Sequence, residues 1–204
     1  MRKSRVIIIS VLGVLLGGLM AVLVLPDVRG RLMRGAGEVV SVGKAQVGGP
    51  FALTDHTGKR VTDKDFRGRF MLVYFGFTYC PDVCPTGLQV MTAALDQIGA
   101  KAERITSILI SLDPERDTPA QLAEYVKAFH PRLVGLTGSL DEIAAAARAY
   151  RVYYKKVKDE KSTVGYTVDH TSILYLMDPK GEFVAHFTHA TAVDAIVSRL
   201  QRVL

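Results

Sequence analysis

The chain has 204 residues, 49% of them hydrophobic, and carries a formal net charge of +6. This length predicts one folded domain with an appendage, and the apolar content is sufficient for a sizeable core. The charge is uneven, because seven basic and two acidic residues precede Ala45, whereas 19 basic and 18 acidic residues follow from there on. The folded part therefore lacks the basic surplus of a nucleic-acid-binding protein, and we expect no nucleic-acid partner.

The N-terminal region is expected to anchor the chain in a membrane. Residues 6–25 form a continuous apolar run whose only hydroxyl group is on Ser10. A helix of this length matches a hydrocarbon layer of ~30 Å. The competing interpretation is a cleaved signal peptide, because residues 1–5 are basic. However, the run exceeds a signal h-region of about 7–15 residues, and no A-x-A cleavage site follows it before Pro26.

The flanks of this run predict its orientation and setting. The basic residues 1–5 favour a cytoplasmic N-terminus and an exported domain. No long Arg/Ser-rich transit peptide is present, so we expect a bacterial inner membrane with the soluble domain facing the periplasm. Residues 26–47 are rich in Gly and Arg without sustained periodicity and are expected to be a juxtamembrane linker. The folded domain is then expected over residues 48–204.

The first half of this domain alternates strands and helices. Residues 51–61 predict two short strands around a turn at Gly58. Residues 70–77 predict a buried strand, and a helix marked by Pro85 and Thr86 follows the two cysteines. A second buried strand is expected over 105–112. The pattern from Thr118 to Gln121 predicts a capped helix that ends near His130.

The second half continues this pattern and closes it with a hairpin. A short strand is expected at 134–136, a capped helix after Ser139, and an extended segment at 152–157. Two antiparallel strands, 172–177 and 182–187, are expected around a turn, with a final helix from Thr191. This order predicts an α/β fold with a mixed sheet and helices on both faces, in the layout of thioredoxin.

The cysteines lie at the turn between the first buried strand and its helix. Cys80 and Cys84 are the only two in the chain, in a C-x-x-x-C spacing one residue wider than the C-x-x-C redox motif. Pro81 and Pro85 stiffen this turn, and a helix N-terminus favours the thiolate. Such a pair can form a disulfide, exchange disulfides or chelate a metal. A purely stabilising disulfide is disfavoured, because closing so short a loop restricts the unfolded chain little.

A third metal ligand is expected from the segment before the hairpin. In a thioredoxin-like chain this segment approaches the cysteine-bearing end of the helix, and here it carries Asp169 and His170. Two thiolates and one imidazole form a soft site suited to Cu(I), with Cu(II) or Zn(II) accommodated if a further ligand enters. Asp169 is the candidate for a carboxylate that orients His170.

The other four histidines and an acidic cluster are expected to have structural roles. His56 is expected in a solvated turn, His130 at a helix end, and His186 and His189 at a strand terminus rather than in a second metal site. Local salt bridges and the Thr118 helix cap are sufficient to explain the acidic cluster at residues 113–117.

Five motifs together resemble the Sco/SenC copper-chaperone family. They are residues 76–85 (GFTYCPDVCP), 110–119 (ISLDPERDTP), 136–138 (LTG), 168–171 (VDHT) and 175–181 (YLMDPKG). The resemblance extends in order from about residue 48 to the C-terminus. It implies a thioredoxin-like fold and a role in assembling the binuclear copper centre of cytochrome c oxidase subunit II. It also implies that Cys80, Cys84 and His170 ligate copper supplied by a donor protein.

A second function is compatible with the same motifs. Members of the family are also argued to reduce the cysteines of the oxidase, so the alternative is a thiol-disulfide oxidoreductase acting through a Cys80–Cys84 disulfide. A thioredoxin-like peroxidase fits less well, because its cysteine surroundings differ. A metal-sensing signalling protein would need a partner surface that the sequence does not identify.

Overall fold

The computed structural model describes residues 46–160 and 165–204. The expected anchor over residues 6–25, and all but the end of the expected linker, lie outside these ranges. Within the described ranges, no helix is both long enough and apolar enough to cross a membrane.

The centre of the fold is a seven-stranded mixed sheet. β3 (Phe70–Gly76) is buried along its whole length and pairs in parallel with β4 (Ile105–Ser111) and antiparallel with β8 (Ile173–Met177). A continuous apolar run of this kind is typical of a strand covered on both faces. The strand order is β2 (Arg60–Thr62), β1 (Ala52–Asp55), β5 (Leu133–Thr137), β4 (Ile105–Ser111), β3, β8 (Ile173–Met177) and β9 (Phe183–Thr188).

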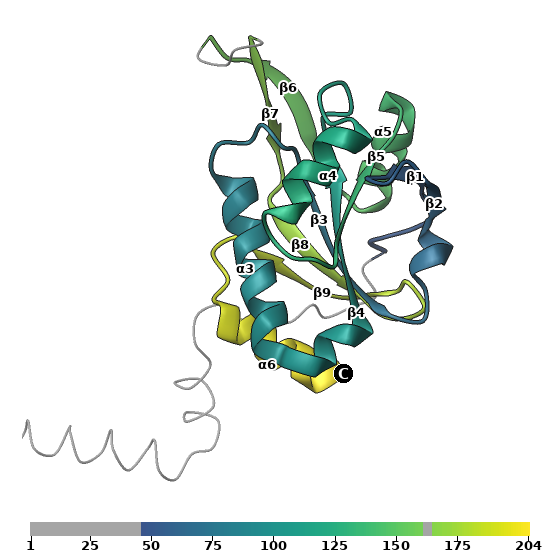
Figure 1. The fold of residues 1–204 in the computed structure, drawn as a ribbon, viewed down its shortest axis with the longest axis vertical. Coiled ribbons are helices and arrows are strands. Elements are labelled where there is room, and N and C mark those ends of the chain that lie inside the picture. The colour runs from purple at the N-terminus through teal and green to yellow at the C-terminus, as the bar shows by residue number, and fades with distance from the viewer. Residues whose placement is uncertain (1–45, 161–164) are drawn as a thin grey trace, which may run out of the picture. The chain divides into compact units, whose positions relative to one another are not determined.

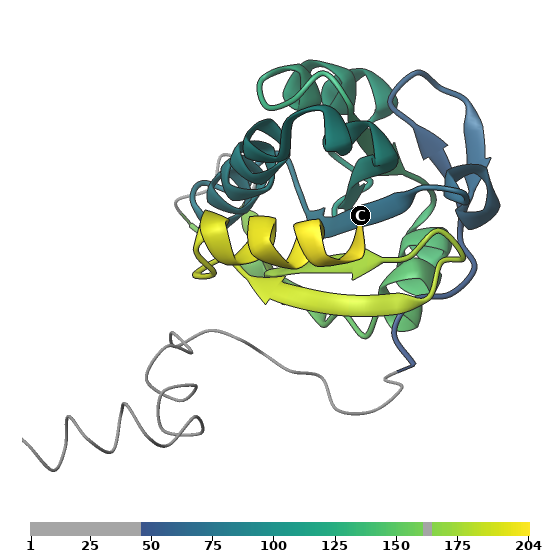
Figure 2. The ribbon, with the colours of Figure 1, turned by 90° about the horizontal axis from the view of Figure 1, so that it is seen from below.

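Helices cover both faces of this sheet, as the sequence predicts. α3 (Val83–Ile98), α4 (Pro119–Lys127) and α6 (Val193–Val203) lie on one face, and α5 (Leu140–Ala149) lies on the other (Figures 1 and 2). α3 packs along α6, and α4 packs on β5. Two short 3₁₀ helices, Asp63–Phe66 and Gly99–Arg104, complete the connections. The fold is therefore thioredoxin-like in its layers.

The helix starts follow the capping signals of the sequence. The hydroxyl of Thr118 accepts a hydrogen bond from the backbone N–H of Gln121 at 3.2 Å, and Pro119 is the first helical residue of α4. Ser139 and Glu142 cap α5 reciprocally. α3 begins at Val83, before the expected Pro85, because a proline in the first helical turn removes only an N–H that has no intrahelical partner.

A second sheet was not predicted. β6 (Tyr154–Lys158) and β7 (Tyr166–His170) form a two-stranded antiparallel hairpin that stands at the upper end of the domain in Figure 1. The sequence indicates an extended segment over 152–157, but it predicts no strand for the residues just before β8. His170 is instead the last residue of a strand, and it pairs with Tyr154.

Candidate metal centre

The two cysteines lie where β3 passes into α3. Cys80 is in the connecting turn and is 9% exposed, whereas Cys84 is the second residue of α3 and is fully buried. The backbone N–H of Cys84 points to the Sγ atom of Cys80 at 3.4 Å. Both thiols are free. The pair therefore occupies the N-terminus of a helix, as the sequence predicts.

Small residues allow Cys84 to pack closely against β3. A Cβ atom on Gly76 would lie 3.0 Å from the Sγ of Cys84, and a Cβ atom on Gly87 would lie 2.9 Å from the ring of Tyr74. The hydroxyl of Tyr74 donates to the carbonyl of Val83 at 3.2 Å, in the first turn of α3. Glycine at both positions lets the strand and the helix approach closely enough to hold Cys84 in place.

His170 completes the cluster from the end of β7. Its Nε2 atom lies 3.3 Å from the Sγ of Cys84, and the ligand atoms of His170, Cys80 and Cys84 all lie within 4.8 Å of one another. Its Nδ1 atom is 3.2 Å from the carbonyl oxygen of Thr171. Because a carbonyl only accepts hydrogen bonds, this contact places the proton on Nδ1 and leaves the Nε2 lone pair directed at the sulfurs.

Asp169 does not occupy the orienting position that the sequence suggests. Its side chain is exposed, and it pairs with Lys155 across the hairpin. Successive side chains of a strand point to opposite faces, so Asp169 and His170 face different ways. The contact at Nδ1 of His170 comes from the backbone of Thr171, and the ring of Phe77 packs edge-on against the imidazole with centroids 5.9 Å apart.

The pKa values of the two thiols are shifted in opposite directions. The hydrogen bond from Cys84, together with those from the backbone amides of Asp82 and Cys84, lowers the pKa of Cys80 well below its usual range. The same hydrogen bond to Cys80, and burial, raise the pKa of Cys84. Cys80 is therefore the thiolate of the pair in the metal-free state, and Cys84 holds the shared proton.

No other group of histidines, cysteines and carboxylates in the described ranges has metal-ligand geometry. His130 accepts a hydrogen bond from the backbone of Arg132, and His186 stacks on Phe183. His56, expected to be solvated, instead accepts a hydrogen bond from the backbone N–H of Gly135 at 3.2 Å, which joins its turn to β5.

The donor set agrees with a soft metal ion. Two sulfur atoms and one imidazole nitrogen suit Cu(I) in trigonal geometry, and they also suit Zn(II) with a fourth ligand. With Cys84 fully buried and Cys80 nearly so, the sulfurs are shielded from solvent. The sequence identifies all three candidate ligands, but it gives no signal for the neighbouring Tyr74.

Comparison with known proteins places this site in a family. The family model SCO1/SenC matches residues 40–204. The chain belongs to the SCO1/SenC family. It is 53% identical over 149 residues to the human protein SCO1 homolog, mitochondrial, in a match that covers 72% of this chain and 49% of the relative. The chain thus spans about half the length of the curated relatives that it matches first.

Solved structures of SCO1/SenC relatives share the fold. The crystal structure of Arabidopsis thaliana ScoI with copper bound has a TM-score of 0.73 and 46% identity, and the match covers 78% of this chain and 99% of that one. BsSco, described as having a disulfide switch and as a member of the Sco family of cytochrome c oxidase assembly proteins, has a TM-score of 0.62 and 27% identity. That match covers 78% of this chain and 95% of the other.

Proposed function

We propose that this protein is a membrane-anchored copper chaperone that binds copper through Cys80, Cys84 and His170. The observation that carries the proposal is the approach of the three ligand atoms to within 4.8 Å of one another. The His170 tautomer fixed by Thr171 supports it, because the nitrogen that faces the sulfurs is the one free to bind metal. A relative with copper bound, 46% identical to this chain, supports the choice of metal.

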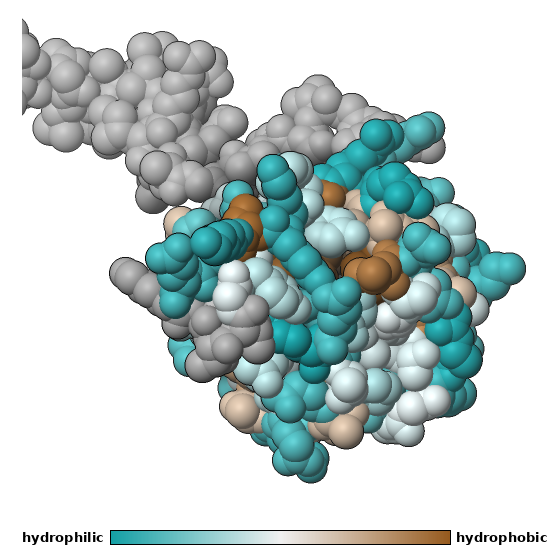
Figure 3. All heavy atoms as spheres, turned by 90° about the horizontal axis from the view of Figure 1, so that it is seen from above, coloured by the Kyte–Doolittle hydropathy of each residue, from teal (hydrophilic) through white to brown (hydrophobic). Residues whose placement is uncertain are grey.

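The proposed client is the binuclear copper centre of cytochrome c oxidase subunit II, with copper supplied by a donor protein. Support comes from BsSco, which is described as belonging to a family of cytochrome c oxidase assembly proteins. Residues 6–25 anchor the chain in a bacterial inner membrane, and the domain faces the periplasm, where exported oxidase domains are reached. The end of the domain that carries the hairpin is mostly hydrophilic, with small separate hydrophobic patches (Figure 3). Such a surface suits a brief polar encounter with a client.

Copper transfer follows from the ligand set. A client presents its own thiolates, which displace His170 and the two sulfurs in turn, so that copper passes without a free ion. Transfer of two electrons, with the proton of Cys84, from the pair to an oxidising protein disulfide would join Cys80 to Cys84 and remove both sulfur ligands. Loading with copper is thereby coupled to the redox state of the pair.

The second candidate function is reduction of exported protein cysteines. It is favoured by the unequal acidity of the pair, because Cys80 is a thiolate able to attack and Cys84 is a protonated thiol beside it. Attack on a client disulfide would form a mixed disulfide, and Cys84 would then resolve it. The client would gain two electrons from the pair, one proton from Cys84 and one proton from solvent, while Cys80 and Cys84 become a disulfide. His170 would not act as a ligand in this reaction.

Competition for Cu(I) between the protein and a chromogenic chelator tests the chaperone function. The full-length chain is used in detergent, fully reduced, beside Cys80→Ser, His170→Ala and the control His189→Ala, whose side chain is exposed on the turn after β9. We expect one tightly bound copper in the parent and in the control. Cys80→Ser should abolish binding, and His170→Ala should weaken it strongly, since each removes a ligand.

The same variants separate the two candidate functions. His170→Ala should leave the rate of thiol-disulfide exchange largely intact while copper affinity collapses. The chaperone function would be rejected if the parent binds Cu(I) weakly, or if His170→Ala binds it as tightly as the parent. The redox potential of the cysteine pair would then be measured to test the reductase function.

A further inference from the structure

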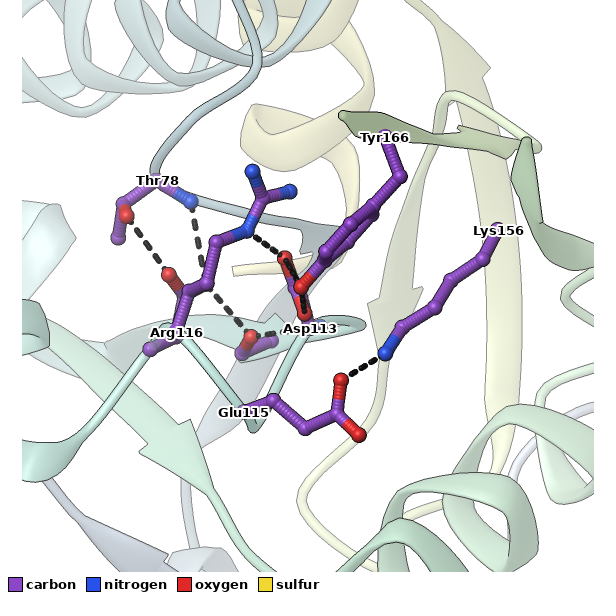
Figure 4. A network of polar contacts seen from close by, with 8 residues as sticks. Thr78, Asp113, Glu115, Arg116, Lys156 and Tyr166 are labelled. Carbon is purple, nitrogen blue, oxygen red and sulfur yellow. Dashed lines mark hydrogen bonds and ion pairs between the residues drawn. The ribbon is translucent and has the colours of Figure 1, made fainter. Parts of the chain in front are cut away.

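A partly buried network of charged and aromatic side chains joins the segments that carry the metal ligands, and its members lie outside the ligand set (Figure 4). It is built on the loop that follows β4, where Asp113 and Asp117 are both fully buried. The sequence suggests that local salt bridges and a helix cap explain these carboxylates. Arg116 does form a local ion pair with Asp113, but the two carboxylates also contact segments that are distant in the sequence and that carry the metal ligands.

Asp117 holds the cysteine turn. It accepts hydrogen bonds from the backbone N–H of Thr78 at 3.1 Å and from the hydroxyl of Thr78 at 2.6 Å. The hydroxyl of Ser111, at the end of β4, donates to the same carboxylate at 2.6 Å. Because Thr78 lies two residues before Cys80, this carboxylate ties the turn to the central sheet.

Asp113 holds the histidine hairpin. The hydroxyl of Tyr166, the first residue of β7, donates to Asp113 at 3.0 Å, and Arg116 forms an ion pair with the same carboxylate. On β6, Lys156 pairs with Glu115 from the same loop. The loop after β4 thus contacts both strands of the hairpin whose last residue is His170.

Arg116 joins the two sides. Its guanidinium carbon lies 4.2 Å from the ring centroid of Tyr166, 4.8 Å from that of Tyr79 and 5.7 Å from that of Phe77, all within cation–π range. Tyr79 and Phe77 flank Thr78 in the cysteine turn, whereas Tyr166 belongs to the hairpin. Only 11% of the arginine side chain is exposed. One guanidinium therefore fills the space between the segment of Cys80 and the strand of His170.

The hairpin depends on such contacts for its position. β6 and β7 pair only with each other within the described residues, and a two-stranded hairpin alone is marginally stable in water. Side-chain contacts must therefore hold it against the rest of the domain. Arg116 contributes contacts between β7 and the cysteine turn, through Tyr166 on one side and Tyr79 and Phe77 on the other.

We propose that Arg116 is the positioning residue that holds His170 against the cysteine pair by stacking between Tyr166 and Tyr79. The residue does not ligate the metal. The planar guanidinium stacks on two rings while its Nε–H reaches Asp113, a combination that the ammonium group of lysine does not reproduce. This inference rests on the proposed copper-binding function, because it assigns Arg116 a share in the copper affinity of that site.

The test compares Arg116→Lys with variants of its ring partner in the reduced full-length protein. Arg116→Lys keeps the charge that pairs with buried Asp113, so the fold is retained. Tyr166→Leu removes the ring, and Tyr166→Phe keeps the ring without the hydroxyl. The control is Arg67→Lys, since Arg67 forms an exposed ion pair with Asp63 away from the metal centre.

Two measurements are made on each variant. The first is amide hydrogen exchange of Tyr166–His170 in the metal-free protein, with α6 as an internal reference. The second is Cu(I) affinity against a chromogenic chelator. Arg116→Lys and Tyr166→Leu should speed amide exchange in β7 about tenfold without changing exchange in α6. They should also weaken copper binding by about tenfold, as is typical when a residue that orients a metal ligand is replaced. Tyr166→Phe should lie close to the parent, and Arg67→Lys should equal it.

The outcomes separate this inference from the proposed function. If the parent binds no copper, the copper function fails and the exchange rates of β7 alone decide whether Arg116 positions the hairpin. Exchange in β7 that is unchanged by Arg116→Lys overturns the inference. The inference is also overturned if the parent binds copper and Arg116→Lys speeds exchange in β7 without weakening copper binding. An equal loss of copper affinity in Arg67→Lys overturns it as well.

Discussion

The two halves of the metal centre are built in different ways. The cysteines lie between β3, which is buried throughout and paired on both sides, and a 16-residue helix packed on the sheet. His170 lies on a hairpin whose strands pair only with each other among the residues described. The contrast shows how one site combines a rigid pair of thiols with a third ligand held mainly by side-chain contacts. Such a ligand can leave first, as the proposed transfer of copper to a client requires.

Hydrogen exchange should give the largest difference between the two halves. Amides of β3 should exchange only when the whole domain unfolds, whereas those of β6 and β7 should exchange through local opening of the hairpin. We expect protection in β3 to exceed that in β7 by about a hundredfold or more. Equal protection in β3 and β7 would mean that the hairpin is as firmly built into the domain as the sheet, and the contrast would be wrong.

Substitution of Gly87 should destabilise the half of the site that carries the cysteines, where α3 packs against β3. A Cβ atom there would lie 2.9 Å from the ring of buried Tyr74, so Gly87→Val should lower the free energy of unfolding by about 1–3 kcal/mol. Chemical denaturation measures this change. Ala93→Val, at an exposed position of the same helix, is the matched control and should cost less. Equal losses in both variants would show that the Tyr74 contact is not tight.

The alkylation rates of the two cysteines should differ by a smaller factor than the exchange rates of β3 and β7. The hydrogen bond from Cys84, supported by backbone N–H groups, lowers the pKa of Cys80, so its thiolate persists as the pH falls. Between pH ~8 and ~6 an ordinary thiol with a pKa of about 8.5 loses its reactivity, whereas Cys80 should keep most of it. Peptide mass spectrometry after iodoacetamide treatment should show Cys80 modified about tenfold faster than buried Cys84 near pH 6. Loss of Cys80 reactivity in parallel with a free thiol would contradict the assigned protonation.

The sequence predicts the half of the site that carries the cysteines well, and the reasons can be identified. The apolar run of β3 and the capping residues Thr118 and Ser139 act locally, so their structural consequence can be worked out from a few neighbours. Cys80 and Cys84 are the only cysteines, and a strand-to-helix turn places them together. The mixed sheet and the helices on both of its faces follow from the same alternation.

The histidine half is harder to predict. β6 contains three lysines in five residues and shows no apolar alternation, so it resembles a polar loop. Its strand character comes from pairing with β7 further along the chain, and the buried Val168 is the one strong apolar signal there. The contacts of Arg116 with Tyr166 and Tyr79 depend on tertiary structure, and nothing in the local sequence around Arg116 indicates them.

X-ray absorption spectroscopy of the reduced, Cu(I)-loaded full-length protein reports the copper ligands themselves. We expect a copper environment of two sulfur atoms and one imidazole nitrogen, from Cys80, Cys84 and His170, with the nitrogen contribution lost in His170→Ala. A parent spectrum with two sulfur ligands and no imidazole, identical to that of His170→Ala, would contradict it.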